Sequence, residues 1–379
     1  MRFSRLAGLA AAASVLLLGA SPASADEAPV ISLDGPPVGV TAGSDGTVYV
    51  TRYDFSGGLF VLPSGAKAPA RTIHTGNFPS SVASAPDGTL YIVQSGSPGT
   101  AEIGVLPGSG GTIADVIPVS PGEHGLTVGP DGSLFVTNPN EGTVSVVLPG
   151  TKVVGRTITV GSAPRSVAVT KNGTAFVTNE YSGTVSVIPA GSVNATQTID
   201  VGSKSNPHGI AADSSGNVYV TNVLTNEVIV VDASKATVTR RIPVGRSPQE
   251  VSVSPDGSIY VTNSEDRTVS VIASGESKVT RTISVGKEPG RLAVTSEGTV
   301  YVANRQDKSV SVLAPEPARA GEPTAAPAAA SGTSRGHSFN TGKGVLIGGV
   351  AVVVLGAIVA IVVVLRRRAA GRAIGSSTM

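Results

Sequence analysis

One sequence repeat occurs seven times along this chain, and each copy contains a tight turn just before its shared motif. Aligned on the glycine of that turn, successive copies lie 41 to 44 residues apart. In five copies the glycine follows Asp or Asn, which is the strongest short hairpin signal because the turn needs a positive φ. The seven glycines are Gly46, Gly88, Gly132, Gly173, Gly216, Gly257 and Gly298. A repeat of this regularity restricts the fold to architectures built from equivalent units.

Each copy predicts four short strands. In the fourth copy they cover 166–170, 174–179, 184–189 and 197–201, where apolar and polar residues alternate and β-branched residues are frequent. No helical periodicity occurs between residues 29 and 314. Repeats of this length with four strands each are typical of propeller blades. We therefore predict an all-β fold over residues 26–314, a seven-bladed β-propeller of four-stranded blades.

The last repeat ends early, after a third strand within 309–315. The segment 31–41, ISLDGPPVGVT, parallels 283–295, where a fourth strand leads into the next blade. This match predicts that Ile31–Leu33 forms the outer strand of the seventh blade. Such a strand would close the ring and remove an unpaired edge.

The first 25 residues predict a secretory signal peptide, with an uncleaved anchor as the alternative. Arg2 and Arg5 precede an apolar run too short to cross a bilayer, and Ala23-Ser24-Ala25 fits a cleavage site. The sequence contains no cysteine. Export therefore needs no oxidative folding, and a lipoprotein anchor on cysteine is excluded.

A second apolar run near the C-terminus predicts a transmembrane helix. Residues 344–365 hold 22 uncharged residues, enough to span the hydrocarbon core, and Arg366–Arg368 follow at once. Positive charge stays cytoplasmic. We expect a Pro/Ala/Gly/Ser-rich stalk at 315–343, the helix at 344–365 and a cytoplasmic tail at 366–379. This describes a single-pass cell-membrane protein with its N-terminus and propeller outside. Sortase-type processing is the alternative, although the LPxTG motif is missing.

The second strand of each copy carries a shared four-residue motif. It reads FVTN at 135–138 and 176–179, YVTN at 219–222 and 260–263, and YVAN at 301–304, with departures to YVTR at 49–52 and YIVQ at 91–94. On these residues the chain resembles the YVTN-type β-propeller repeat family of exported and surface-layer bacterial and archaeal proteins. The resemblance implies the fold and the export, but no activity, because propellers host unrelated functions.

Two positions of the motif predict structural roles. The aromatic residue should fill the wedge between neighbouring blades, with sugar binding as the alternative. The Asn should bond backbone in the turn that follows. The aromatic residues are Tyr49, Tyr91, Phe135, Phe176, Tyr219, Tyr260 and Tyr301, and the asparagines are Asn138, Asn179, Asn222, Asn263 and Asn304.

Chemistry is better sought where the copies differ, at the start of each innermost strand. There the copies carry, in order, Val38-Gly39, Ser80-Ser81, His124-Gly125, Arg165-Ser166, His208-Gly209, Gln249-Glu250 and Gly290-Arg291. Pro precedes six of the seven pairs and fixes the backbone angle, while Glu123 stands in the third. In propellers these positions converge on one mouth of the central channel. The predicted binding site comprises His124, Arg165, His208, Gln249, Glu250 and Arg291.

Two other interpretations of this mouth remain open. It can be a solvated rim in which Glu250 and Arg291 pair across adjacent blades. Two histidines with Glu123 or Glu250 can also bind a divalent ion, but the arginine between them argues against a metal. We expect no metal and no cofactor. His74 and His337 lie outside the cluster.

The function that these features favour is a non-catalytic binding or scaffold module for a cell-envelope polymer, a peptide or a partner protein. A net charge of +2 with 14% charged residues argues against nucleic acid. An alternative is a streptogramin-lyase-like enzyme, because 206–222 is loosely similar to the repeats of those propellers. That resemblance implies a mouth histidine, a carboxylate and a divalent metal, yet no catalytic His-x-Glu pattern is found. A purely structural surface component is the third alternative, and no nucleotide-binding or hydrolase motif occurs.

Overall fold

The computed structural model describes residues 26–96, 99–108, 110–122, 125–202 and 205–315. The predicted signal peptide, membrane helix and tail, His337, and the stalk from residue 316 onward lie outside them. So do His124 and Glu123. Within the described part of the chain, no helix has the length and apolar character needed to cross a membrane.

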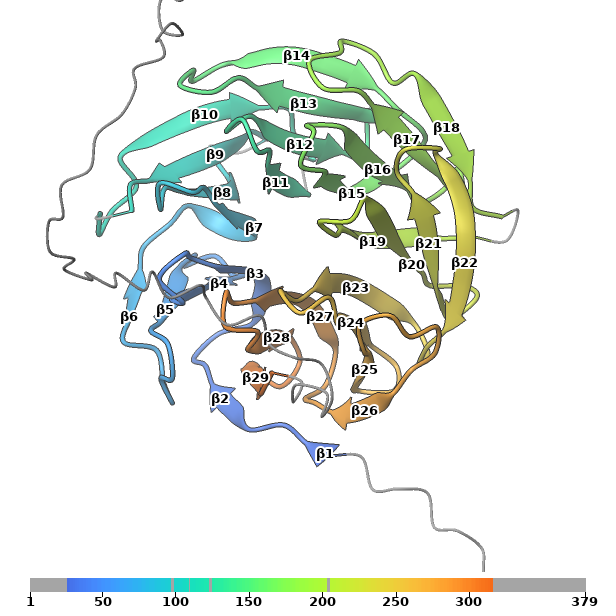
Figure 1. Cartoon of the computed structure of the whole chain (residues 1–379). Coiled ribbons are helices and arrows are strands. Elements are labelled where there is room, and N and C mark those ends of the chain that lie inside the picture. Colours follow the sequence, from blue (N-terminus) through green and yellow to red (C-terminus); the bar gives the residue numbers. More distant parts are fainter. Residues whose placement is uncertain (1–25, 97–98, 109, 123–124, 203–204, 316–379) are drawn as a thin grey trace, which may run out of the picture. The chain divides into compact units, whose positions relative to one another are not determined.

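Seven sheets surround a central axis, and consecutive strands run antiparallel from the axis outward (Figure 1). Blade one holds β3 (Pro37–Ala42), β4 (Val48–Arg52), β5 (Leu59–Leu62) and β6 (Arg71–Ile73). Blade two holds β7 (Asn77–Ser84), β8 (Leu90–Ser95), β9 (Ala101–Leu106) and β10 (Asp115–Val119). Blade three holds β11 (Leu126–Val128), β12 (Leu134–Asn138), β13 (Thr143–Val147) and β14 (Val154–Thr159).

The remaining blades follow the same plan. Blade four holds β15 (Pro164–Val169), β16 (Ala175–Asn179), β17 (Thr184–Ile188) and β18 (Gln197–Asp200). Blade five holds β19 (Pro207–Ala212), β20 (Asn217–Asn222), β21 (Glu227–Asp232) and β22 (Thr237–Pro243). Blade six holds β23 (Pro248–Val253), β24 (Ile259–Asn263), β25 (Thr268–Ile272) and β26 (Arg281–Ser284). Blade seven holds β27 (Pro289–Val294), β28 (Val300–Asn304) and β29 (Ser309–Leu313). The predicted all-β propeller of seven four-stranded blades is confirmed.

The N-terminal segment lies along the outer edges of two blades. Strand β2 (Val30–Ser32) pairs antiparallel with β29, so that Val30 faces Ser311, and it is the fourth strand of blade seven. Strand β1 (Asp26–Glu27) pairs in parallel with β26 as a fifth strand of blade six. The sequence pattern did not predict this second pairing. Ile31 and Ala28 are buried here, at 4% and 6% exposure.

The core lies between neighbouring blades. Phe176 of blade four, for example, packs in one cluster with Ile210 and Val218 of blade five. Five of the motif aromatics are buried, and the other two, in blades one and two, are half-buried. Because the β-branched residues of facing sheets interdigitate around these rings, the predicted packing role is confirmed.

The motif asparagines are fully buried and bond the turns around them. The Oδ1 atom of Asn179 accepts from the N–H of Gly161 at 3.1 Å, and that of Asn222 accepts from the N–H of Asn206 at 2.9 Å. The Nδ2 atom of Asn179 donates to the hydroxyl of Ser186 at 2.9 Å. In blade three the Oδ1 atom of Asn138 accepts from the N–H of Asn140 at 3.1 Å, in the turn that follows the motif as predicted. In blades four and five the backbone partner lies instead in the loop before the inner strand.

The motif threonine has a role that the sequence pattern did not predict, because it joins adjacent blades. The Oγ1 atom of Thr221 accepts from the N–H of Gly209 in its own blade at 2.7 Å and donates to the carbonyl of Gln249 in the next blade at 3.0 Å. We call the boundary between the inner strands of two consecutive blades a seam. A single hydroxyl thus satisfies one buried donor and one buried acceptor at this seam.

Candidate functional site

A sharp backbone turn lies at the start of the innermost strand in four blades. Phe78, Ala163, Ser247 and Glu288 stand directly before prolines and have φ angles of 48°, 53°, 54° and 55°. The carbonyl of Ala163 accepts from the N–H of Glu180, so the turn is fixed to the loop that follows the second strand. In blades four, six and seven the residue after the proline lines the cavity at the channel mouth.

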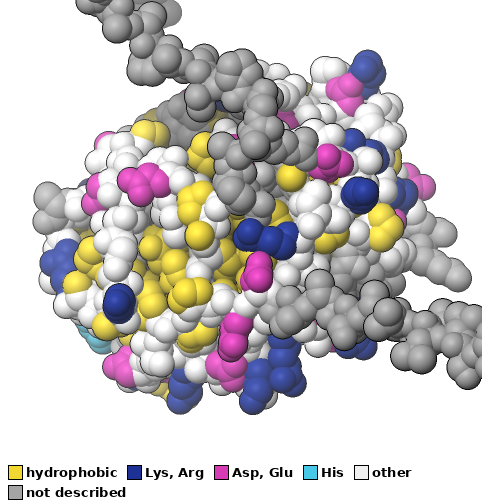
Figure 2. Space-filling view, turned by 60° about the horizontal axis from the view of Figure 1, so that its bottom comes forward, with side chains coloured by type: hydrophobic (Ala, Val, Ile, Leu, Met, Phe, Trp, Pro, Cys, Tyr) yellow, Lys and Arg dark blue, Asp and Glu magenta, His cyan; other side chains and the backbone are white. Residues whose placement is uncertain are grey.

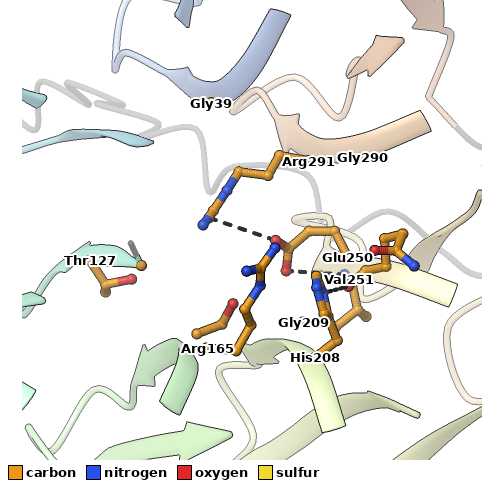
Figure 3. Close-up of polar contacts among 12 residues, drawn as sticks. Gly39, Thr127, Arg165, His208, Gly209, Glu250, Val251, Gly290 and Arg291 are labelled. Carbon is orange, nitrogen blue, oxygen red and sulfur yellow. Dashed lines mark hydrogen bonds and ion pairs between the residues drawn. The ribbon is translucent and has the colours of Figure 1, made fainter. Parts of the chain in front are cut away.

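The five predicted site residues that the structure describes line one cavity of about 210 Å³ at the channel mouth. They are Arg165, His208, Gln249, Glu250 and Arg291. They come from blades four to seven, and Figure 3 shows several of them converging on the channel. The sixth predicted residue, His124, lies outside the described residues. His74 directly follows β6 and is exposed, away from this cavity.

His208 is held as a neutral imidazole. Its Nδ1 atom lies 2.9 Å from the carbonyl oxygen of Gln249 in the next blade (Figure 3). Because a carbonyl only accepts, Nδ1 carries the proton and Nε2 remains an acceptor. Burial, followed by the charge of Arg165, lowers the pKa of His208 to about 3. The ring is therefore uncharged at neutral pH.

Glu250 and Arg291 pair across adjacent blades. Their Oε2 and Nη1 atoms are 3.7 Å apart, and the glutamate side chain is only 13% exposed. Burial raises the pKa of Glu250, while the charge of Arg291 opposes that shift. The pairing that the solvated-rim interpretation expected is present. The charge of Arg165 also lowers the pKa of Glu250, although no ion pair joins these two residues.

Arg165 extends from blade four toward that pair (Figure 3). Burial lowers the pKa of Arg165 first and the like charge of Arg291 lowers it further, while the charges of Glu180 and Glu250 oppose this shift. Among the described residues, no carboxylate lies within ion-pair distance of Arg165. A partly buried guanidinium with unused donors faces the cavity, and a second guanidinium and a neutral imidazole lie beside it. This arrangement suits an anionic group.

The described residues of the mouth do not fit a divalent cation. They contain no group of three His, Asp or Glu side chains that could hold one. Glu250, which stands in the blade after His208, is already paired with Arg291. In addition, the positive charge of Arg165 opposes the binding of another cation at His208.

An aromatic cluster adjoins the cavity, and the sequence analysis missed it. The ring of Phe78 lies 5.4 Å from that of Tyr53 and 4.5 Å from that of Phe55. Arg305, which lines the cavity, lies over the Tyr53 ring at 5.5 Å. Phe78 has a φ of 48°, an unusual backbone conformation for an aromatic residue. The sequence could have indicated this cluster, because these three aromatic residues do not stand at the aromatic position that the seven copies share.

The surface of the propeller carries charges of both signs and a second groove. Figure 2 shows Lys and Arg side chains interspersed with Asp and Glu on the side turned to the viewer, and hydrophobic side chains gathered between them. A groove of about 590 Å³ lined by blades five to seven contains Asp213 and Tyr219. The Tyr219 hydroxyl donates to Asp213 at 2.9 Å, and burial raises the pKa of Tyr219 to about 12. This pair is internally satisfied.

Solved structures share the fold at low sequence identity. Hydrazine synthase of Kuenenia stuttgartiensis is 16% identical, with a TM-score of 0.67 over 79% of this chain and 99% of that chain. A streptogramin B lyase is 15% identical, with a TM-score of 0.64 over 75% and 95%. Virginiamycin B lyase from Staphylococcus aureus is 15% identical, with a TM-score of 0.63 over 75% and 97%.

A comparison with family models identifies the family of the chain, which the shared fold does not. No curated protein matches the sequence. The model of the virginiamycin B lyase family matches residues 23–312, which include every blade. The chain therefore belongs to the virginiamycin B lyase family.

Proposed function

We propose that this propeller is a binding module that holds an anionic group of its ligand at the channel mouth. The observation that carries the proposal is the guanidinium of Arg165, which lines the cavity with Arg291 and forms no ion pair with a carboxylate among the described residues. The ligand would be a carboxylate-bearing part of a cell-envelope polymer, a peptide or a partner protein. Export by the N-terminal signal and anchoring by the helix at 344–365 belong to the same proposal.

The electrostatics of the mouth favour an anion in particular. A bound carboxylate would offset the repulsion between Arg165 and Arg291, which lowers the pKa of Arg165. Each charge-assisted hydrogen bond to such a group contributes about 1.5–3 kcal/mol. The Nε2 atom of neutral His208 adds an acceptor for a hydroxyl or amide of the same ligand.

Nuclear magnetic resonance tests this proposal with hexanoate as the probe. We expect the Nε–Hε signal of Arg165 to shift on titration with hexanoate and the affinity to fall at least about tenfold in an Arg165→Gln variant. The matched control is Arg246→Gln, because Arg246 is exposed and does not line the cavity. Equal binding by all three proteins, or no shift at all, would overturn the proposal.

A second candidate is lyase-type elimination, and family membership favours it. One solved relative, 14% identical, is a catalytically inactive histidine-to-alanine variant of virginiamycin B lyase with quinupristin. In this chain, neutral His208 retains a free Nε2 that can accept a proton from a ligand. The misfit of the described residues to a divalent cation is the argument against this candidate.

Chromatography of quinupristin incubated with the protein, with and without Mg²⁺, separates the two candidates. Conversion that disappears in a His208→Asn variant would establish the second candidate. The Asn side chain keeps a donor for the carbonyl of Gln249. Unchanged quinupristin in every sample, together with hexanoate binding, would favour the binding module over the lyase.

A further inference from the structure

Four of the seven seams follow one hydrogen-bonding rule, and at a fifth Thr51 of blade one accepts from the N–H of Gly39 in its own blade. In four blades the motif hydroxyl accepts an N–H from its own inner strand and donates to the inner-strand carbonyl of the next blade. Those hydroxyls belong to Thr137, Thr178, Thr221 and Thr262. The carbonyls they reach belong to Arg165, His208, Gln249 and Gly290, so each bridge lies directly at the channel mouth.

Blade seven breaks this rule. Ala303 stands at the motif position and has no hydroxyl. By the same register, the two groups that a hydroxyl would join are the N–H of Arg291 in blade seven and the carbonyl of Val38 in blade one. Blade two also lacks threonine, but Val93 there keeps the volume of the missing side chain. Among the seven motif positions, only Ala303 lacks both the hydroxyl and the bulk.

The mouth cavity reaches this seam. Val38, Gly290, Arg291 and Ala303 all line it together with Arg165. Gly290 stands at the position that Arg165, His208 and Gln249 occupy in the three preceding blades, and a Cβ atom added there would meet nothing within 4 Å. The cavity is therefore open beside blade seven. Ala303 belongs to its lining, although it is itself only 1% exposed.

We propose that a ligand hydroxyl takes the place of the missing threonine hydroxyl at seam seven–one. It would accept from the N–H of Arg291 and donate to the carbonyl of Val38. This inference rests on the proposed anion site, because the same ligand places its carboxylate on Arg165. The ligand class is thereby narrowed to hydroxylated carboxylates of about monosaccharide size, such as sugar acids.

Calorimetric or NMR titration with two matched probes tests the subsite. Gluconate and hexanoate have the same number of chain carbons and one carboxylate, but only gluconate carries hydroxyls. We expect gluconate to bind about tenfold more tightly, and Ala303→Thr to remove that difference because the protein supplies its own hydroxyl. An equal affinity for both probes would overturn the hydroxyl subsite and leave the carboxylate site intact. A preference for gluconate that persists in Ala303→Thr would place the hydroxyl contact elsewhere and also overturn it.

A ligand-free comparison separates this inference from the proposed function. Ala303→Thr and Ala303→Val add side chains of the same shape, and only the first adds a hydroxyl. We expect the Thr variant to melt about 2 °C or more above the Val variant, because it satisfies the N–H and the carbonyl at the seam. Equal melting temperatures would show that those groups do not receive a hydroxyl, whatever the outcome for the anion site. Failure of both probes to bind would overturn the proposed function and the ligand class together, even if the Thr variant is the more stable.

Discussion

Seam five–six and seam seven–one have the same backbone register but differ in how they are joined. At the first, the carbonyl of Gln249 receives two donors, the hydroxyl of Thr221 at 3.0 Å and Nδ1 of His208 at 2.9 Å. At the second, Ala303 provides no hydroxyl, and the cavity occupies part of the boundary. The N-terminal segment instead pairs with the outer edge of blade seven. The comparison teaches that hydrogen bonds between inner strands join the blades at seam five–six, whereas near seam seven–one the N-terminal segment adds pairing at the outer strand of blade seven.

The largest effect is expected from removing the outer reinforcement. Deleting residues 26–35 removes β1 and β2 and exposes apolar surface that Ile31 and Ala28 now cover. The loss of one buried isoleucine alone costs about 1.5–3 kcal/mol, and the lost strand pairing adds to it. We expect a fall in melting temperature of several degrees by differential scanning calorimetry. Val30→Ser is the control, since Val30 is 52% exposed. An unchanged melting temperature would rule out a closing role for this segment.

Seam five–six should be sensitive to pH through His208. The pKa of this group falls from 6.5 to about 3 on folding, with burial as the main cause. Between these values the unfolded chain binds a proton that the folded chain does not, so the free energy of unfolding falls as the pH falls. The expected slope is about 1 kcal/mol per pH unit.

Urea unfolding at pH 7, 6, 5 and 4 measures this slope, with His208→Asn as the reference. Other groups, including Glu250, titrate in both proteins, so the difference between the two curves isolates the imidazole. We expect the stability of the wild type relative to the variant to decline from pH 6.5 downward. Parallel curves would contradict the assignment of a neutral, buried His208.

A smaller effect should follow from removing the hydroxyl at the same seam. Thr221→Val keeps the side-chain shape but leaves the N–H of Gly209 unpaired and takes one donor from the carbonyl of Gln249. We expect a loss of about 2 kcal/mol in chemical denaturation. Thr221→Ser retains the hydroxyl and should lose less. If the Val and Ser variants are equally stable, packing rather than hydrogen bonding joins the seam.

The smallest effect is expected at the loops outside both seams. The side chain of Arg246 contacts Asp266 at 2.6 Å but is 64% exposed. Solvent screens such pairs, and their net contribution is small. Arg246→Ala should therefore leave the melting temperature unchanged within error. A clear drop would mean that the loop pairs, and not only the seams, hold the blades in place.

The fold could be predicted from the sequence because the repeat carries its own register. The turn glycines and the alternating residues fixed four strands per blade, and the short last repeat pointed to an N-terminal outer strand. The parallel pairing of Asp26–Glu27 could not be predicted, since two residues show no periodicity. The motif threonine was missed for another reason. A repeated threonine in a strand is already expected from its β-branched side chain, so nothing marked its hydroxyl.

The candidate site could be predicted only as a list of converging residues. Arg165, His208 and Gln249, which follow prolines, line one cavity together with Glu250 and Arg291, and their role in binding stays a prediction. The pairing of Glu250 with Arg291, which the solvated-rim interpretation expected, is present. The hydrogen bond of His208 to the carbonyl of Gln249 depends on side-chain directions, which spacing does not encode. His124 stays a prediction.

The position of β2 also governs the order in which the molecule can form. Its partner β29 is the last strand of the ring, so almost the whole propeller must be synthesised before β2 can pair. Contacts between such distant residues slow folding, because loop-closure entropy opposes them until late. During translation the N-terminal segment would remain unpaired until the strands of blade seven have been synthesised. Completion of the ring would therefore be a late kinetic step.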